Sequence, residues 1–329
     1  MKVNDAIIEG NERKKMSVLY IVIPCHNEEE CIPETAAQLT AKLLSMIDKG
    51  ICSKESKILF IDNGSNDQTW SLIVDLYSKN DFICGLKLTN DFGHQNALLA
   101  GLITAKEYAN CIVSMDADLQ DDIEVLDQFL NKYHNGCEIV FGVRKERKTD
   151  TFFKRNSALL FYKLMKVLGA DIVYNHADYR LMSRKAVNSL AEFQEVNLFL
   201  RGIIPLIGYK TDIVYYDRSQ RYAGESKYTF GKMLSFAMDG ITSFSAKPLK
   251  IISNLGILIS ILSIFALIYA LLPKLYGIST SGWSGIVASI WLLGGIQLFC
   301  IGVVGEYIGK IFKEVKQRPR FHIDTFLKK

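Results

Sequence analysis

Short runs of β-favouring residues alternate with helix-length segments through the first part of the chain. Each run is rich in Val, Ile, Leu, Phe or Cys, and the runs cover residues 18–23, 57–62, 83–89, 111–116 and 138–141. This alternation predicts βαβ units and a mainly parallel sheet in an α/β domain, which we assign to residues 17–216. Ligands of such sheets bind at the carboxyl ends of the strands, so the chemistry is expected there.

Two long apolar runs lie nearer the C-terminus. No charged residue lies between Lys250 and Lys274, and fourteen of the twenty-two residues from 251 to 272 are Ile, Leu or Phe. A helix of that length reaches about 33 Å, which is enough to cross a bilayer core. A second charge-free run covers residues 283–305. We therefore predict a hairpin of two transmembrane helices over residues 251–305, in preference to buried helices of a globular core.

Basic residues flank the two apolar runs unequally. The connecting loop holds Lys274 alone, whereas residues 306–329 carry seven basic residues: Lys310, Lys313, Lys316, Arg318, Arg320, Lys328 and Lys329. Because basic flanks stay on the cytoplasmic side, residues 306–329 are predicted to be a basic cytoplasmic tail. Two spans return the chain to its starting side, so the protein is predicted to be multi-pass in the cell membrane, with both termini cytoplasmic. The N-terminal tail, residues 1–16, lacks the apolar core of a signal peptide.

A helical pattern precedes the first apolar run. Apolar residues recur at helical spacing from Phe230 to Phe244, with Lys232 and Asp239 between them. The pattern predicts an amphipathic helix within a juxtamembrane segment, residues 217–250. Two interpretations stay open: an ordinary helix that covers the soluble domain, and an interfacial helix that holds this domain against the lipid headgroups.

Composition narrows the class of protein further. The hydrophobic fraction of 49% and the mean hydropathy of +0.12 are high for a soluble protein. Lys and Arg number 39 against 35 Asp and Glu, a net charge of +4, so no nucleic-acid partner is expected. The seven Cys contain no Cys-x-x-Cys pair, which favours reduced cytosolic thiols over a disulfide scaffold.

Polar and acidic residues follow four of the predicted strands. The sequence has neither a Gly-x-Gly-x-x-Gly motif after the first strand nor a P-loop motif, which disfavours a dinucleotide dehydrogenase and a P-loop nucleotidase. The strand ends instead carry Pro24-Cys-His-Asn-Glu-Glu29, Asp62-Asn-Gly-Ser65, Asn90-Asp-Phe-Gly-His94 and Asp116-Ala-Asp-Leu-Gln120. Asp62 is interpreted either as a turn residue or as a carboxylate that accepts hydrogen bonds from a nucleotide base or ribose.

The pair Asp116 and Asp118 carries the clearest chemistry. Side chains two apart on an extended chain point the same way, so both carboxylates are expected to face one site, with Gln120 adding a neutral oxygen. Mg²⁺ and Mn²⁺ prefer hard oxygen ligands, and substrate phosphates often complete their coordination, so the set fits a nucleotide diphosphate. The alternative is that Asp118, Asp121 and Asp122 only cap the following helix.

Together these motifs resemble the family-2 glycosyltransferases of GT-A fold. Among them the chain is most similar to the polyprenyl-phosphate glycosyltransferases, which include dolichyl-phosphate mannose synthase and bactoprenol glucosyltransferase. The resemblance covers nearly the whole chain and rests on motifs in a fixed order. These are Val22-Ile-Pro-Cys-His-Asn-Glu-Glu29, Asp62-Asn-Gly-Ser-Asn-Asp67, Asn90-Asp-Phe-Gly-His-Gln95, Met115-Asp-Ala-Asp-Leu-Gln-Asp121, Ala177-Asp-Tyr-Arg-Leu181, Arg221-x-x-Gly-x-Ser-Lys-Tyr228 and, after the two apolar runs, Glu306-Tyr-Ile-Gly-Lys310.

The resemblance implies roles for individual residues. The nucleotide would be bound by Pro24, Asn27, Glu28, Asp62, Gly93, His94, Asp116 and Ala117. A Mg²⁺ or Mn²⁺ ion would be held by Asp116, Asp118 and Gln120, and Asp178 would be the catalytic residue near the reacting centre. The chain departs from the usual pattern at two places: His94 stands where many relatives carry Lys, and Asn175-His-Ala177 replaces a small-residue approach to the catalytic Asp.

A basic cluster follows the fifth predicted strand. Seven Lys or Arg lie between Arg144 and Lys163, and one interpretation is a solvated loop attracted to anionic lipid headgroups. Arg144 closes the strand and Arg155 begins the next helical segment, so these two are better placed to clamp a phosphate. The resemblance implies that an acceptor phosphate is bound by Arg144, Arg155, Arg221, Ser226 and Lys227.

The implied reaction is an inverting transfer of a sugar from a nucleotide sugar to polyprenyl phosphate. UDP-glucose and undecaprenyl phosphate are the expected substrates, with GlcNAc, mannose or a modified sugar as alternatives. A phosphate monoester is largely dianionic at neutral pH, so it has little proton for a general base to remove. Asp178 is therefore expected to orient the acceptor or to stabilise charge that develops on the sugar.

Other classes of protein fit the sequence less well. A processive polysaccharide synthase would be expected to carry a Gln-x-x-Arg-Trp motif and more spans, and a transferase acting on protein or sphingolipid would not need the Arg221 to Lys227 cluster. An inactive membrane-anchored binding or scaffold protein is disfavoured by the intact Asp116, Asp118 and Asp178. The oligomeric state, including a homo-oligomer, stays open.

Overall fold

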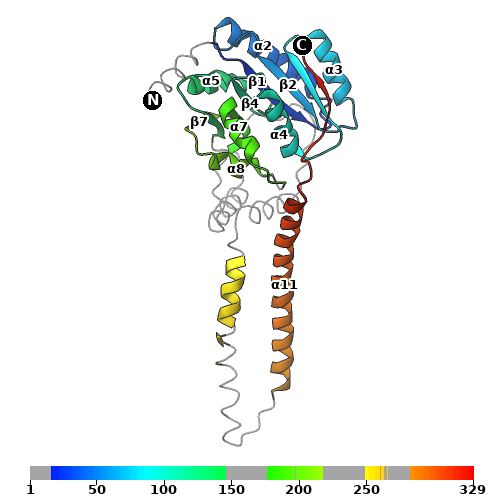
Figure 1. The fold of residues 1–329 in the computed structure, drawn as a ribbon, viewed down its shortest axis with the longest axis vertical. Helices are drawn as coiled ribbons and strands as arrows, with labels where there is room; N and C mark the ends of the chain where they lie inside the picture. The colour runs from blue at the N-terminus through cyan, green and yellow to red at the C-terminus, as the bar shows by residue number, and fades with distance from the viewer. Residues whose placement is uncertain are drawn as a thin grey trace, which may run out of the picture. The chain divides into compact units, whose positions relative to one another are not determined.

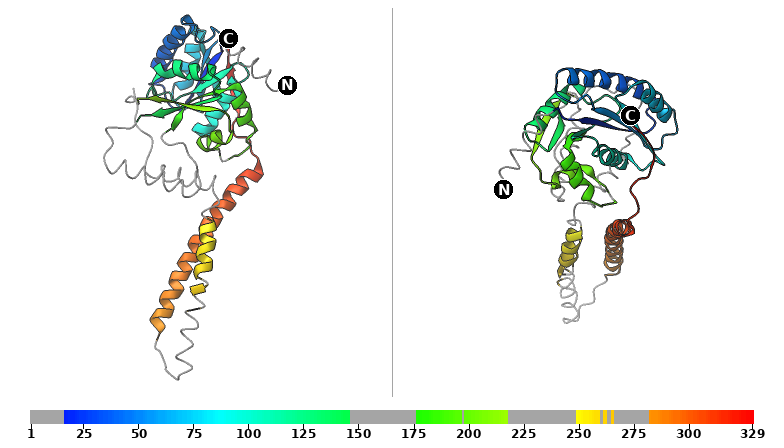
Figure 2. Two further views of the ribbon diagram at one scale, coloured as in Figure 1. Left: turned by 90° about the vertical axis from the view of Figure 1, so that its left-hand side faces the viewer. Right: turned by 45° about the horizontal axis from the view of Figure 1, so that its top comes forward.

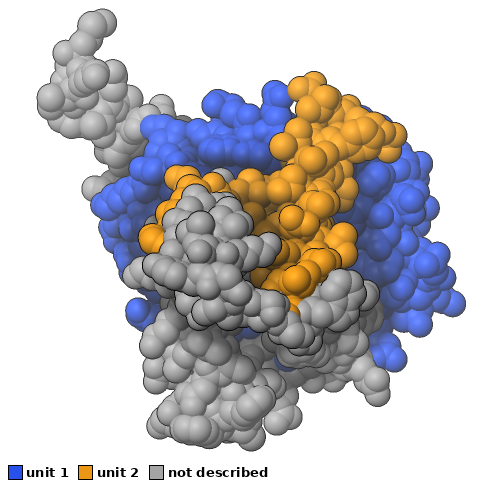
Figure 3. Space-filling model, turned by 90° about the horizontal axis from the view of Figure 1, so that it is seen from below, with its two compact units in different colours: residues 1–157, 172–228, 319–329 blue, residues 158–171, 229–318 orange. Residues whose placement is uncertain are grey.

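The computed structural model describes residues 16–145, 176–196, 198–217, 249–259, 261–262, 265 and 282–329. The chain forms two compact units: residues 1–157, 172–228 and 319–329 make up unit 1, and residues 158–171 and 229–318 make up unit 2 (Figure 3). Four of the predicted acceptor-phosphate residues lie outside the described residues, as does the predicted amphipathic helix; the four are Arg155, Arg221, Ser226 and Lys227.

Unit 1 is built on a mixed sheet (Figure 1). In the described part of the chain it has eight strands in the order β7-β5-β6-β4-β1-β2-β3-β8. Their bounds are β1 Leu19–Cys25, β2 Lys57–Asp62, β3 Ile83–Leu88, β4 Cys111–Ser114, β5 Ile139–Arg144, β6 His176–Ser183, β7 Thr211–Tyr216 and β8 Ile323–Leu327. Strands β1 to β4 pair in parallel, as do β5 and β7, whereas β6 and β8 are antiparallel to their neighbours. The predicted α/β class with a mainly parallel sheet is confirmed.

Helices lie on both sides of this sheet (Figure 2). They are α2 Ile32–Asp48, α3 Thr69–Lys79, α4 His94–Ala105, α5 Leu126–His134, α7 Arg184–Glu192 and α8 Leu200–Leu206, with a 3-10 turn at Ile123–Val125 before α5. All seven residues of β1 are buried, because helices cover both of its faces. Ile21 of β1 belongs to the core cluster that includes Leu39 of α2, while Gly101 brings α4 against the opposite face, since an added Cβ would lie 2.6 Å from Val22 Cγ1.

The C-terminal residues return to unit 1. The basic residues predict a tail over residues 306–329, whereas in the structure β8 pairs antiparallel to β3 at the edge of the sheet. Lys329 Nζ lies 2.8 Å from Asp81 Oδ1, and Leu327 Cδ1 would lie 3.4 Å from a Cβ added at Gly85. The count of basic charges could not reveal this strand, because a five-residue strand without a fully buried residue has neither an apolar run nor a clear inside–outside alternation.

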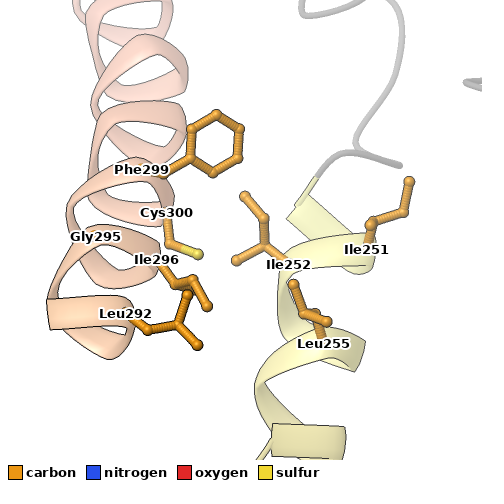
Figure 4. Close-up of a pocket in the computed structure, with 8 residues that line it drawn as sticks. All are labelled: Ile251, Ile252, Leu255, Leu292, Gly295, Ile296, Phe299 and Cys300. Atoms are coloured by element: carbon orange, nitrogen blue, oxygen red, sulfur yellow. The ribbon is translucent and has the colours of Figure 1, made fainter. Parts of the chain in front are cut away.

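Unit 2 contains apolar helices with exposed apolar side chains. Helix α11 spans Trp283–Lys316, so it covers the predicted second span and continues beyond it. Its portion Leu292–Lys316 contains an 18-residue window with a mean hydropathy of 1.6 and is long and apolar enough to cross a membrane. A shorter apolar helix covers Leu249–Ile259, within which the predicted first span begins. A cavity of about 420 Å³ lies between the two helices (Figure 4), lined by Ile251, Ile252, Leu255, Leu292, Gly295, Ile296, Phe299 and Cys300.

Candidate active site

Asp62 ends β2 at the carboxyl edge of the parallel strands. Its side chain is fully buried, and Oδ1 accepts a hydrogen bond from the backbone N–H of Ser65 at 3.2 Å. Pro24 of β1 lies next to it, in register with Ile61. Within the described residues, Asp62 Oδ2 is buried and has no hydrogen-bond partner. A buried carboxylate oxygen without a donor is costly, so Asp62 is suited to accept an N–H or O–H from a ligand.

The loop after β1 is tied to the loop after β2. Asn27 has a positive φ of 53°; its N–H donates to Ser65 Oγ at 3.0 Å, and its Oδ1 accepts from the N–H of Asn66 at 2.9 Å. The N–H of Glu28 donates to Thr69 Oγ1 at 3.0 Å. Two predicted nucleotide residues, Asn27 and Glu28, are thereby held beside the end of β2.

The loop after β3 is fixed by one carboxylate. Asp91 Oδ1 accepts from Asn63 Nδ2 at 2.6 Å and from the N–H of Gly93 at 2.8 Å. The N–H of Phe92 donates to Asn63 Oδ1 at 3.0 Å. Gly93 has φ of 82°, a conformation that favours glycine, and α4 begins directly after it at His94. The loop therefore presents the start of α4 next to the β2 loop.

The loop after β4 is a turn and not an extended strand. The strand ends at Ser114, so the expectation that Asp116 and Asp118 point the same way from an extended chain is wrong. Leu119 has φ of 55°, and the N–H of Gln120 donates to Asp118 Oδ1 at 3.2 Å. Both carboxylates are half-buried. A turn follows β4 and leads to the 3-10 turn at Ile123–Val125 that precedes α5.

The capping alternative applies to one of the three acidic residues considered. Asp122 caps the 3-10 turn, since its Oδ1 accepts from the N–H of Glu124 at 2.9 Å. Asp118 bonds inside its own turn, as described above. The loop is anchored from another element, because Thr35 Oγ1 of α2 donates to the carbonyl of Ala117 at 2.7 Å.

The carboxylates of this loop could hold a divalent ion only with help from other oxygens. In the described part of the chain, no group of three or more His, Cys, Asp or Glu side chains is arranged to hold a metal ion. Asp116 and Asp118 supply two hard oxygen donors, and Gln120 lies two residues on. This set fits Mg²⁺ or Mn²⁺ in a site that substrate phosphates complete, which is the usual arrangement for Mg²⁺.

Asp178 of β6 lies among three basic side chains. Arg201 binds it with two contacts, Nη2 to Oδ2 at 3.0 Å and Nε to Oδ1 at 3.3 Å. Arg180 contacts Oδ1 from the core, where its side chain is 1% exposed, and His94 Nε2 lies 3.5 Å from Oδ2. Burial alone would raise the pKa of Asp178, but Arg201, His94 and Arg180 hold it well below its usual range.

His94 connects the Asp178 carboxylate to the β4 loop. Its Nε2 lies 3.8 Å from Asp116 Oδ1 as well as 3.5 Å from Asp178 Oδ2. Burial lowers the pKa of His94, but the two carboxylates outweigh burial and raise it above its ordinary value. The structure thus brings together three predicted residues, Asp178, His94 and Asp116, from β6, α4 and the β4 loop.

Arg144 is the one predicted acceptor-phosphate residue that the structure describes. Its Nε donates to Tyr216 Oη at 3.1 Å, and that hydroxyl donates to Asp121 Oδ1 at 2.5 Å. Burial and the neighbouring Asp116 raise the pKa of Asp121 to about 6, although Tyr216 and Arg144 act in the opposite direction. Arg144 is therefore linked to the acidic loop through a buried carboxylate.

Sequence reasoning missed Arg201 and Tyr216. Arg201 is the single basic residue in the apolar stretch from Leu198 to Gly208, and an isolated charge in such a stretch is a usable signal for a buried pair. Tyr216 carries no comparable signal, because a Tyr at the end of a strand is ordinary.

Two family models match the chain. The model described as Glycosyl transferase family 2 matches residues 20–191, and the model described as GtrB C-terminal hairpin matches residues 247–311. The first match contains every described residue of the candidate site except Arg201 and Tyr216. The second contains the described apolar helix at Leu249–Ile259 and most of α11.

Several curated proteins are similar along nearly their whole length. The chain is 53% identical to "Uncharacterized glycosyltransferase YkoT" of Bacillus subtilis (strain 168), over 96% of this chain and 94% of the relative. It is 39% identical to "Prophage bactoprenol glucosyl transferase homolog" of Escherichia coli (strain K12), over 92% and 97%. It is 37% identical to "Bactoprenol glucosyl transferase" of Shigella phage SfX, over 93% and 98%.

Solved structures give a more distant likeness. Glucosyl-3-phosphoglycerate synthase from Mycobacterium tuberculosis, in a complex with Mn²⁺, uridine diphosphate and glucosyl-3-phosphoglycerate, is 15% identical with a TM-score of 0.44. The match covers 72% of this chain and 81% of that chain.

Proposed function

Because the chain belongs to glycosyl transferase family 2, we propose that it transfers glucose from UDP-glucose to polyprenyl phosphate at the cytoplasmic face of the cell membrane. The observation that carries the proposal is the similarity to bactoprenol glucosyl transferases over 92% of this chain, apolar helices included. The match of residues 247–311 to the GtrB C-terminal hairpin supports a lipid-linked acceptor. Undecaprenyl phosphate is the acceptor that we expect.

The donor nucleotide would bind at the carboxyl ends of β1 to β4. Asp62, with its unpartnered buried oxygen, is suited to accept from the base, and the loops that it touches would surround the nucleotide. The residues proposed for this role are Pro24, Asn27, Glu28, Asp62, Gly93, His94, Asp116 and Ala117.

A divalent ion would be held by Asp116, Asp118 and Gln120. When bound, Mg²⁺ or Mn²⁺ supplies positive charge that stabilises the diphosphate as it leaves. Asp116 also attracts His94, whose pKa is raised by Asp178 and Asp116, so a cationic ring is favoured near Asp116. Transfer at full rate after chelation, or in an Asp118→Ala variant, would contradict this assignment.

Asp178 would act through charge and orientation. An oxygen of the polyprenyl phosphate attacks the anomeric carbon, the bond to the nucleoside diphosphate breaks, and this single displacement inverts the anomeric configuration. A carboxylate held among Arg201, Arg180 and His94, with its pKa well below the usual range, is a poor proton acceptor at neutral pH. It is suited to stabilise positive charge that develops on the sugar and to orient the three basic side chains around it.

The acceptor phosphate would bind near the end of β5. Arg144 is proposed to contact it together with Arg155, Arg221, Ser226 and Lys227. Two arginines can bind a phosphate dianion through paired hydrogen bonds, which position it more strictly than a single ammonium does.

The test uses membranes that contain the full-length protein. They are incubated with undecaprenyl phosphate and, separately, with UDP-glucose, UDP-N-acetylglucosamine and GDP-mannose, and the lipid product is identified by its mass. We expect a hexosyl undecaprenyl phosphate with UDP-glucose and none in membranes without the protein. A product formed only from another donor would correct the sugar, and nucleotide-sugar turnover that needs no lipid phosphate would overturn the proposed acceptor.

A further inference from the structure

A buried hydroxyl stands between Arg144 and Asp121. Tyr216, the last residue of β7, is 1% exposed. Its Oη donates to Asp121 Oδ1 at 2.5 Å and accepts from Arg144 Nε at 3.1 Å. Arg144 Nη2 lies 3.6 Å from the same carboxylate oxygen, so the guanidinium and the carboxylate approach each other without a close direct hydrogen bond.

The position of this hydroxyl is fixed by packing. The Tyr216 ring lies edge-on against Tyr179, with centroids 5.3 Å apart, and Tyr179 lies edge-on against Phe129 at 4.8 Å. Gly142 of β5 makes room for both tyrosines, because an added Cβ would lie 2.8 Å from the Tyr179 carbonyl and 3.2 Å from Tyr216 Cε1. Such packing leaves the ring little freedom, so its oxygen is a rigid hydrogen-bond partner.

The hydrogen bond to Nε orients the planar guanidinium. A guanidinium recognises a phosphate through hydrogen bonds whose directions its plane sets, so turning the plane changes what the group can bind. Asp121 is only 1% exposed and carries the charge that attracts Arg144. Without the intervening hydroxyl, Arg144 and Asp121 could close into a direct paired contact, and the guanidinium would turn away from its present direction.

We propose that Tyr216 is a positioning residue that holds the Arg144 guanidinium in the orientation needed to bind the acceptor phosphate. The inference rests on the function proposed above and assigns a role to a residue outside the predicted site. Tyr216 acts through Arg144 and does not touch the substrates. Because Asp121 follows the carboxylates of the β4 loop, the same contact joins the acceptor side of the site to the donor side.

The test compares two neighbouring tyrosines in the full-length protein. Tyr216→Phe removes only the buried hydroxyl, whereas Tyr215→Phe removes a hydroxyl from a side chain that is 58% exposed. KM is measured for undecaprenyl phosphate and for the nucleotide sugar. We expect Tyr216→Phe to raise the acceptor KM about tenfold, the loss typical of one hydrogen bond to a charged group, and to leave the donor KM unchanged. Tyr215→Phe should change neither value.

A second variant separates positioning from a general structural role. Arg144→Lys also should raise the acceptor KM selectively, and adding Tyr216→Phe to Arg144→Lys should cause no further rise, because the residue through which Tyr216 acts is gone. The proposal is overturned if Tyr216→Phe leaves the acceptor KM unchanged, if it raises both KM values together, or if the two substitutions add. Should Tyr216→Phe fail to fold, an unchanged acceptor KM in Arg144→Lys overturns it alone. Wild-type protein that makes no lipid-linked sugar instead overturns the proposed function, and this inference with it.

Discussion

Three basic side chains decide what the Asp178 carboxylate can do. Arg180 is buried beneath it, Arg201 reaches it from the partly exposed side, and His94 links it to Asp116. A carboxylate so surrounded stays ionised, contributes negative charge to the site and is a poor proton acceptor. The arrangement explains why a buried Arg180 is tolerated, since an unpaired charge in the core would be destabilising.

Substitution of Asp178 should therefore affect stability as well as rate. In Asp178→Asn the shape is kept but Arg180 loses its charged partner, so we expect the free energy of unfolding to fall by about 3 kcal/mol. The transfer rate of the folded protein should fall at least about 100-fold. Thermal unfolding and single-turnover transfer measure the two effects.

A surface carboxylate provides the matched control for that variant. Asp212 pairs with Lys132 at 2.6 Å, but its side chain is 45% exposed, and exposed ion pairs contribute about 0 to 1 kcal/mol. Asp212→Asn should leave the rate unchanged and the unfolding temperature nearly so. Equal stability of Asp178→Asn and Asp212→Asn would show that Arg180 does not depend on the charge of Asp178.

His94 predicts a pH-dependent contribution to stability. Its pKa is raised in the folded protein, so the cationic ring is favoured by folding. The resulting stabilisation is complete below the unfolded pKa of about 6.5 and is lost as the pH rises through the higher folded pKa. His94→Gln should therefore lower the unfolding temperature most at or below about pH 6, and the difference from wild type should shrink as the pH rises. His322→Gln, at an exposed ring, is the control, and a difference that is the same at every pH would contradict the prediction.

The acidic residues of the site are easier to predict from the sequence than the side chains that bind them, Arg201 and Tyr216. Asp62, Asp116 and Asp118 were expected from their positions after strands, which local pattern reveals. Arg201 bonds to a residue 23 positions away and Tyr216 to one 95 positions away, and only the folded chain brings these partners together. The roles proposed for all of them stay predictions.

Burial explains which elements the sequence predicts. Strands β1 to β4 are almost entirely buried, so they form continuous apolar runs that are readily recognised. Strand β6 carries the charged pair Asp178 and Arg180 in its middle, and β7 has three residues that are only partly buried or exposed before its buried Val214. Neither strand has the apolar run or strict alternation that single-sequence reasoning depends on.

Strand β8 should stabilise both the sheet edge and the loop after β3, residues 89–93, which belongs to the proposed donor site and is called the donor loop below. Its pairing covers the edge of β3, and just before it the carbonyl of His322 accepts from the N–H of Thr89 at 3.1 Å, at the start of the donor loop. Deletion of residues 321–329 should lower the unfolding temperature and raise the KM for the nucleotide sugar, because that loop loses a hydrogen bond and its edge strand.

A shorter deletion isolates the strand from the charged end of the chain. Removal of Lys328 and Lys329 alone takes away the exposed contact with Asp81 and leaves β8 in place. It should therefore change the unfolding temperature and the KM for the nucleotide sugar little. If the longer deletion changes the unfolding temperature and the KM for the nucleotide sugar no more than the shorter one does, β8 stabilises neither the sheet edge nor the donor loop.

At the scale of the whole molecule, the two units differ in how much hydrophobic surface they expose. The core of unit 1 is closed by helices, whereas α11 of unit 2 exposes large apolar side chains such as Leu298 at 73% and Phe299 at 70%. Exposed apolar surface on this scale requires a non-aqueous environment or a partner. With the similarity to bactoprenol glucosyl transferases and the match to the GtrB C-terminal hairpin, this surface indicates membrane association. The sequence alone predicts membrane association, because each apolar run is continuous in the sequence.

The orientation of the chain is tested by thiol labelling. The bias of basic residues predicts that the loop between the spans faces away from the cytoplasm, while the end of α11 and the catalytic domain face the cytoplasm. Six of the seven native cysteines are buried and the seventh, Cys300, is half-buried in α11, so an introduced surface cysteine dominates the labelling. In intact cells a membrane-impermeant maleimide should label Ser279→Cys and should label Gln317→Cys only after the cells are broken. Labelling of Gln317→Cys in intact cells would put the catalytic domain on the side without cytosolic nucleotide sugars, so the proposed reaction could not proceed as written.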